Sequence, residues 1–119
     1  MIEKNKGFTR VYKAMYYSYK GFKACFANEA AFRQELTLAL ILIPLAIWLP
    51  VTKLERIVMI STVVMVLIVE LLNSGIEAVV DRIGYEQHEL AGRAKDMGSA
   101  AVLISLMLWG YVWGSILFL

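Results

Sequence analysis

The segment MGSAAVLISLMLWGYVWGSILFL, residues Met97–Leu119, runs for 23 residues without a charged side chain. A helix needs roughly 20 largely apolar residues to cross the hydrocarbon core of a bilayer, so this segment is long enough by itself. Two further apolar runs precede it, the 16-residue Leu36–Val51 and a longer stretch from Ile57 to Val80. The sequence therefore predicts an all-α membrane protein whose membrane-spanning helices cover residues 29–50, 54–82 and 91–118.

The composition of the whole chain agrees with this class. The 119 residues allow one domain, 1–119, and 60% of them are hydrophobic while 18% are charged. These proportions exclude a water-soluble globular enzyme of this size. A single cysteine, Cys25, excludes an internal disulfide framework, and a net charge of +2 gives little support to nucleic-acid binding.

The distribution of basic residues predicts the orientation of the chain in the membrane. Seven of the twelve Lys and Arg residues precede residue 36, and three more lie between Asp81 and Asp96. Only Lys53 and Arg56 lie in the loop between the first two apolar runs. Because basic loops stay on the cytoplasmic side, we expect a cytoplasmic N-terminus and a periplasmic C-terminus.

The N-terminal region, residues 7–27, has the pattern of a surface helix. Its large apolar side chains recur at helical spacing, at Phe8, Val11, Tyr12, Met15, Tyr16, Tyr19, Phe22 and Phe26. Arg10, Lys13 and Lys20 fall on the opposite side. A basic, aromatic-rich amphipathic helix is typical of the membrane interface. We also expect Asn28 to be the N-cap of the following helix.

The second apolar run carries a polar face in VELLNSGIEAVVD, residues Val69–Asp81. At about 100° per residue, one side of a helix collects Glu70, Asn73, Ser74, Glu77 and Asp81. A charged side chain costs at least ~2.5 kcal/mol near the bilayer centre, so its presence favours a functional site. A polar seam that pairs helices, or residues that emerge at the cytoplasmic end, would explain Asp81 more easily than Glu70.

Carboxylates that converge at a membrane edge suit a hard divalent cation such as Mg²⁺, which prefers oxygen ligands and commonly bridges to phosphates. Glu29 lies at a depth similar to that of Glu77, and Arg93 and Lys95 could offset phosphate charge. The sequence contains neither a Walker A motif nor a Gly-rich kinase loop. Any nucleotide chemistry must therefore use a different architecture.

Three blocks, NEAAFRQE (Asn28–Glu35), VELLNSGIEAVVDRIG (Val69–Gly84) and HELAGRAKDMGSAAVLI (His88–Ile104), resemble the bacterial integral-membrane diacylglycerol kinase family. GFTR at Gly7–Arg10 agrees with the same pattern. The resemblance implies a homotrimer in the bacterial inner membrane, with sites shared between chains. The implied reaction transfers the ATP γ-phosphoryl group, with Mg²⁺, to 1,2-diacylglycerol and gives phosphatidic acid.

The resemblance also implies roles by position. Glu70 would be the catalytic base, Asn73 would position Glu70 or the acceptor, and Glu29 and Glu77 would hold Mg²⁺ on the nucleotide. The other residues that would line the ATP site are Arg10, Tyr17, Glu86, Gln87, His88, Lys95 and Asp96. Lipid contacts would come from Ala14, Ser18, Tyr19, Lys23, Ala31, Phe32, Arg33, Gln34, Glu35, Trp48, Leu49, Arg56, Glu70, Ser99 and Trp113.

Three alternatives remain open at this point. An undecaprenol kinase would use the same chemistry on a polyprenyl acceptor, although the NEAAFRQE block and the GFTR start favour diacylglycerol. A small multidrug-type transporter also embeds a Glu in the membrane, but it typically has four spans and few charges in its loops. A non-enzymatic helical assembly would not need Glu70, Asn73 and Glu77 on one face.

Overall fold

The computed structural model describes residues 6–83 and 89–119, and these ranges contain four helices and no strand. The helices are α1 (Gly7–Asn28), α2 (Ala30–Trp48), α3 (Lys53–Ile83) and α4 (Glu89–Phe118). The expected all-α architecture is therefore confirmed.

Three of the helices, α2, α3 and α4, are long and apolar enough to cross a membrane. At 1.5 Å per residue, the 19-residue α2 is about 28 Å long, which is close to the ~30 Å of a hydrocarbon core. The 31-residue α3 is about 46 Å long and must extend beyond the core. Glu70 lies about 26 Å along α3 from Lys53, near the far edge of such a core, and Glu77 lies beyond it.

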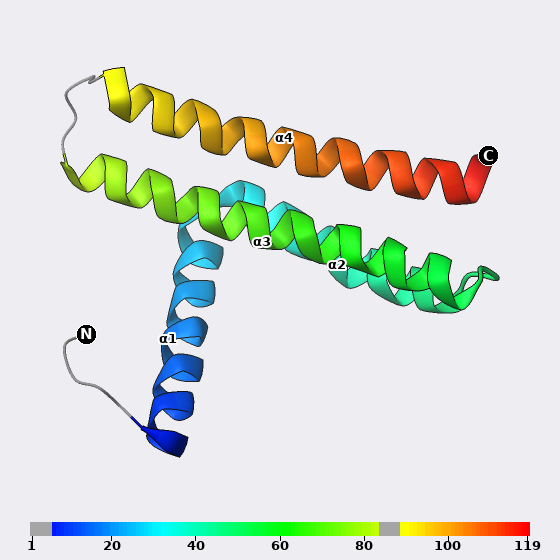
Figure 1. Cartoon of the computed structure of the whole chain (residues 1–119), viewed down its shortest axis with the longest axis horizontal. Helices are drawn as coiled ribbons and strands as arrows, with labels where there is room; N and C mark the ends of the chain where they lie inside the picture. The colour runs from blue at the N-terminus through cyan, green and yellow to red at the C-terminus, as the bar shows by residue number, and fades with distance from the viewer. Residues whose placement is uncertain (1–5, 84–88) are drawn as a thin grey trace.

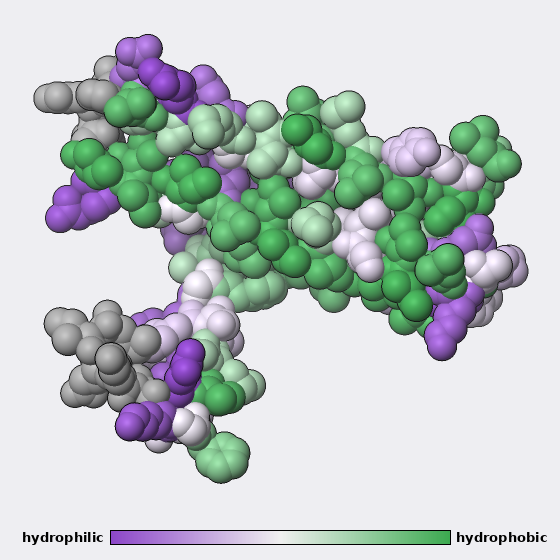
Figure 2. Space-filling model, viewed as in Figure 1, coloured by the Kyte–Doolittle hydropathy of each residue, from purple (hydrophilic) through white to green (hydrophobic). Residues whose placement is uncertain are grey.

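The spanning helices lie side by side with α3 in the middle (Figure 1). α3 packs on both α2 and α4, whereas α1 projects sideways from the start of α2 (Figure 1). Hydrophobic side chains cover the middle of the bundle and hydrophilic ones gather at its ends and on α1 (Figure 2). The central contact cluster consists of Ala39, Ala46, Met59, Val63 and Trp113.

A hydrogen bond across the core fixes α4 against α3. The Trp113 indole Nε1 donates to the Met59 carbonyl at 3.0 Å and to Thr62 Oγ1 at 3.2 Å. Trp113 is only 5% exposed, so these bonds form where water cannot compete. The neighbouring Trp109 differs, because its buried Nε1 has no acceptor within the described residues.

The turn from α1 into α2 occurs at Glu29, whose backbone is extended at φ −119° and ψ 109°. The expectation that Asn28 is the N-cap of α2 is wrong, because Glu29 holds that position without a side-chain cap bond. Asn28 Nδ2 instead donates back to the Ala24 carbonyl of α1 at 2.8 Å. Arg33 also donates to α1, to the Phe26 carbonyl at 2.8 Å and the Ala27 carbonyl at 3.2 Å. Side chains therefore satisfy the last carbonyls of α1 and fix the angle at which it leaves the bundle.

The turn between α2 and α3 is held by charged side chains. Arg56 donates to the carbonyls of Ala46, Leu49 and Val51 at 3.0, 3.1 and 3.3 Å. Thr52 and Glu55 form a capping box, in which each backbone N–H donates to the other side chain, at 2.9 and 3.1 Å. These bonds satisfy the free backbone groups where one helix ends and the next begins.

Trp113→Phe removes both indole hydrogen bonds and leaves an aromatic ring in the core. We expect it to lower the free energy of unfolding by about 1–2 kcal/mol. Trp109→Phe is the matched control, since its Nε1 donates to no acceptor in the described part of the chain, and it should cost less. Thermal unfolding in detergent micelles, followed by circular dichroism, measures the difference. Equal losses in the two variants would contradict the role of the Trp113 bonds.

Candidate active site

A hollow of about 800 Å³ lies where α1 meets α3 and the start of α2. Its walls combine small residues of α1 with polar residues of α3, and it is large enough for a polar headgroup or part of a nucleotide. It is lined by Ser18, Gly21, Phe22, Ala24, Cys25, Asn28, Glu29, Leu71, Ser74, Gly75, Glu77, Ala78 and Asp81. The hollow brings Glu29 and Glu77, both predicted site residues, into one wall.

A chain of hydrogen bonds connects α1, α3 and Glu29 inside this hollow. The Cys25 thiol donates to Ser74 Oγ at 3.5 Å, and the Ser74 hydroxyl donates to Glu29 Oε1 at 3.2 Å. The Glu77 side chain lies near Glu29, whose field acts on it. Burial raises the pKa of the Cys25 thiol above its ordinary value, and the field of Glu29 acts in the same direction. Cys25 is therefore a neutral donor that helps to orient Ser74 towards Glu29.

An ion pair joins α4 to the open side of the same wall. Lys95 Nζ lies 2.7 Å from Asp81 Oδ1, and the Lys95 charge also acts on Glu77. Both side chains of the pair are substantially exposed, at 43% and 61%. The Lys95 ammonium is thus available beside the carboxylates without being buried among them.

Glu70 and Asn73 lie deeper along the polar face of α3. Glu70 is 5% exposed, and its Oε2 has no hydrogen-bond donor within the described residues. Asn73 Oδ1 is buried and likewise without a donor in the described part of the chain. It points at Gly98 of α4, where an added Cβ would overlap that oxygen. Gly98 therefore allows α4 to pack closely over Asn73.

The predicted ATP-site residues of α1, Arg10 and Tyr17, lie apart from this group. Arg10 is about 28 Å and Tyr17 about 18 Å from Glu29 along the helix axis. Ser18 lines the hollow and donates to the Ala14 carbonyl at 2.8 Å, whereas Tyr19 is 62% exposed. Within one chain the structure does not bring Arg10 or Tyr17 to the carboxylates. The other α1 residues among the predicted lipid contacts, Ala14 and Lys23, are exposed.

The remaining predicted residues fall into three groups. Phe32 is fully buried and packs edge-on against Phe22 with ring centroids 5.2 Å apart, so its packing, like that of Trp113, is internal. Trp48, Leu49 and Arg56 lie together at the α2–α3 turn. Exposed or half-buried positions on α2 and α4 are occupied by Ala31, Arg33, Gln34, Glu35, Asp96 and Ser99. Glu86, Gln87 and His88 lie outside the described residues.

The donor set around Glu29 fits a magnesium–nucleotide complex better than a site made of protein ligands alone. Within residues 6–83 and 89–119, no group of three or more His, Cys, Asp or Glu side chains is placed to hold a metal ion. Mg²⁺ in phosphoryl-transfer sites is commonly held by one or two carboxylates, with water and substrate phosphates completing the shell. Glu29 and Glu77 match that requirement.

Two features of the site were missed at the sequence level. No sequence pattern indicated that Gly98 lies against Asn73, because the register between α3 and α4 is a tertiary property. Glu35 was assigned only a lipid contact, although its side chain lies near Glu70. A charged residue one position before the uncharged Leu36–Val51 run was the available signal.

The helices and the carboxylate face define a membrane protein with a polar site at one end of its bundle. The family model described as prokaryotic diacylglycerol kinase matches residues 16–117. Diacylglycerol kinase of Escherichia coli K12 is 56% identical over 113 residues, which are 95% of this chain and 93% of that protein. The Haemophilus influenzae diacylglycerol kinase is 56% identical over 97% of this chain and 98% of its own length. The Pseudomonas aeruginosa diacylglycerol kinase is 50% identical over 93% of this chain and 90% of its own length. The chain belongs to the prokaryotic diacylglycerol kinase family.

The Lys95–Asp81 pair should contribute little to stability, because both partners are exposed. A double-mutant cycle with Lys95→Met and Asp81→Asn should give only a small coupling in the free energy of unfolding. The coupling should shrink when the salt concentration is raised. A large coupling that is insensitive to salt would show that the pair is a structural element.

Proposed function

We propose that this protein transfers the γ-phosphoryl group of ATP to the free hydroxyl of 1,2-diacylglycerol, giving phosphatidic acid and ADP. The observation that carries the proposal is the depth of the polar face of α3 in a chain of this family. Glu70 lies near the edge of the apolar span and Glu77 about 10 Å beyond it. A lipid hydroxyl and a water-borne nucleotide can meet only at such a boundary.

The chemistry follows from the order of the carboxylates. Glu70 is the general base: the O–H bond of the acceptor breaks and its proton passes to the Glu70 carboxylate. The acceptor oxygen bonds to the γ-phosphorus, the bond from that phosphorus to the β–γ bridging oxygen breaks, and ADP leaves. Asn73, one turn further along α3, orients Glu70 or the acceptor.

Charge on the transferred group needs compensation from the other end of the site. Glu29 and Glu77 would hold Mg²⁺, which would supply positive charge to the nucleotide phosphates. Lys95, at the rim and next to Glu77, supplies a second positive charge towards the phosphates. Glu86, Gln87, His88 and Asp96 complete the nucleotide site in this proposal.

The remote position of Arg10 and Tyr17 supports a site shared between chains. These residues reach the nucleotide from α1 of a neighbouring subunit in a homotrimer. The large exposed side chains of α1, including Phe8 at 93% and Tyr12 at 72%, support a helix that lies in the membrane interface. The protein lies in the bacterial inner membrane, with a cytoplasmic N-terminus and a periplasmic C-terminus. The lipid contacts are those that the family resemblance assigns to α1, to the start of α2, to the α2–α3 turn, and to Ser99 and Trp113 of α4.

Glu70→Gln and Glu77→Gln should separate catalysis from nucleotide binding. In mixed micelles with γ-labelled ATP and dioleoylglycerol, Glu70→Gln should lower kcat at least about 100-fold, since the base is lost. Its affinity for MgATP, measured by titration calorimetry, should stay close to wild type. Glu77→Gln should weaken MgATP binding about tenfold, a loss of about 1.4 kcal/mol.

Glu55→Gln is the matched control, because Glu55 lies on the same helix at the opposite end and Gln also fits a capping box. It should leave both kcat and MgATP affinity unchanged. Equal loss of nucleotide affinity in Glu70→Gln and Glu77→Gln would refute the division of roles. Transfer to undecaprenol in preference to dioleoylglycerol would refute the assigned acceptor.

Gly98→Ala should act on catalysis through Asn73. The new Cβ overlaps Asn73 Oδ1, and because that atom ends a flexible side chain, the amide can swing away while the fold persists. We expect kcat to fall towards the level of Asn73→Ala with little change in thermal stability. Gly110→Ala, whose Cβ meets nothing within 4 Å, is the control and should keep full activity. Unchanged kcat in Gly98→Ala would show that the orientation of the Asn73 amide does not affect catalysis.

A further inference from the structure

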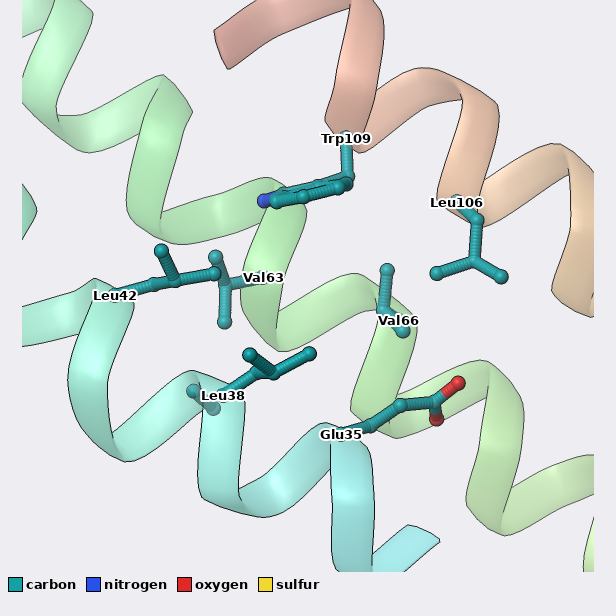
Figure 3. A pocket seen from close by; sticks show the side chains of 8 residues that line it. Glu35, Leu38, Leu42, Val63, Val66, Leu106 and Trp109 are labelled. Carbon is teal, nitrogen blue, oxygen red and sulfur yellow. The ribbon is translucent and has the colours of Figure 1, made fainter. Parts of the chain in front are cut away.

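Glu35 is a charged residue in an apolar place. It lines a cavity of about 50 Å³ between α2, α3 and α4 whose other lining residues are Leu38, Ala39, Leu42, Val63, Val66, Leu106 and Trp109. Figure 3 shows its carboxylate pointing from α2 towards α3, beyond Val66. Glu70 follows Val66 by four residues, one helical turn along α3.

The carboxyl groups of Glu35 and Glu70 lie close enough across the α2–α3 contact to act on each other electrostatically. In each of them Oε2 is buried and finds no donor among the described residues. Two ionised carboxylates at this separation repel strongly where water is scarce, and such pairs commonly retain one proton. One proton shared between the two carboxyl groups would give a hydrogen-bond partner to both unpaired Oε2 atoms.

The basic side chains near Glu35 and Glu70 already bind other groups. Arg33, two residues before Glu35, donates to the Phe26 and Ala27 carbonyls. Lys95 of α4 pairs with Asp81, about 16 Å along α3 from Glu70. The other titratable groups around the pair are Cys25 on α1, whose thiol donates to Ser74, and Glu29 and Glu77, which face each other. None of these contacts places a cation on Glu35 or Glu70, so a proton is the available compensation.

We propose that Glu35 and Glu70 share a single proton, and that Glu35 is the positioning residue of the catalytic base. This inference rests on the proposed function. The carboxylic acid of Glu35 donates to Glu70 Oε2 and thereby aims the second Glu70 oxygen at the acceptor hydroxyl. When that hydroxyl loses its proton to Glu70, the pair holds two protons, and one returns to water after the product leaves. Glu35 itself does not touch the reacting atoms.

Infrared spectroscopy of the reconstituted protein tests the shared proton without activity. The carbonyl stretch of a protonated carboxyl group, identified by its shift in D₂O, should be present in wild type at neutral pH. It should be missing from both Glu35→Gln and Glu70→Gln, since either amide removes the need for the proton. Thr37→Val, which removes a polar group from the same helix, should keep the band. Absence of the band in wild type, or its survival in either Gln variant, would overturn the proposal.

Kinetics test the positioning role. Glu35→Leu leaves Glu70 Oε2 without a donor, and kcat should fall about 10- to 100-fold, as for loss of one hydrogen bond to a charged group. KM for both substrates should change little. Glu35→Gln still donates from its amide and should keep kcat within about threefold of wild type.

The outcomes separate this inference from the proposed function. An inactive wild-type protein would contradict the proposed function itself. An active wild type with Glu35→Leu and Glu35→Gln equally impaired, or with Glu35→Leu fully active, would contradict only the role of Glu35. Because Glu35→Leu could also disturb packing, its thermal unfolding is measured beside that of Thr37→Val, and a kcat loss that tracks unfolding would count against the proposal.

Discussion

The structure depends on one constraint. The helix α3 has a polar face, and it must run through a region where water cannot form hydrogen bonds to these polar side chains. An unpaired polar group costs several kcal/mol in hydrocarbon, so each polar side chain of α3 needs a partner from a neighbouring element. α1 and Glu29 supply the partners of Ser74, and α4 supplies Lys95 to Asp81 at the exposed end of the polar face. The position of α1 and the start of α2 against α3 follows from the first of these demands.

Contacts in the apolar half of the bundle determine where the residues of the polar half lie. Trp113 anchors α4 on Met59 and Thr62, and Arg56 with the capping box of Thr52 and Glu55 closes the turn between α2 and α3. These contacts lie at the end of α3 opposite to Glu77. They set the register of the helices, and with it the position of Gly98 over Asn73. A shift of one turn there would move a side chain by about 5.4 Å, more than any site contact tolerates.

Much of this architecture was predictable from periodicity. Uncharged runs of sufficient length predicted three spanning helices, and the 100° spacing placed Glu70, Asn73 and Glu77 on one face of α3. The sequence could not set contacts between helices, because hydrophobic side chains pack in several registers at similar cost. It therefore missed Gly98 against Asn73 and Glu35 against Glu70. The N-cap of α2 was misplaced for a related reason, since Asn28 can cap forwards or, as it does, donate back to α1.

The placement of the carboxylates also explains why such a small chain can carry a polar site. Glu70 and Glu77 lie two turns apart on one rigid helix, so the inner and outer ends of the polar face keep a fixed separation without a loop to hold them. Glu70 is 5% exposed, whereas Glu77 faces the open hollow near Lys95. Residues of one type thus acquire different surroundings from depth alone, because the inner carboxyl group is shielded from solvent and the outer one is open to it.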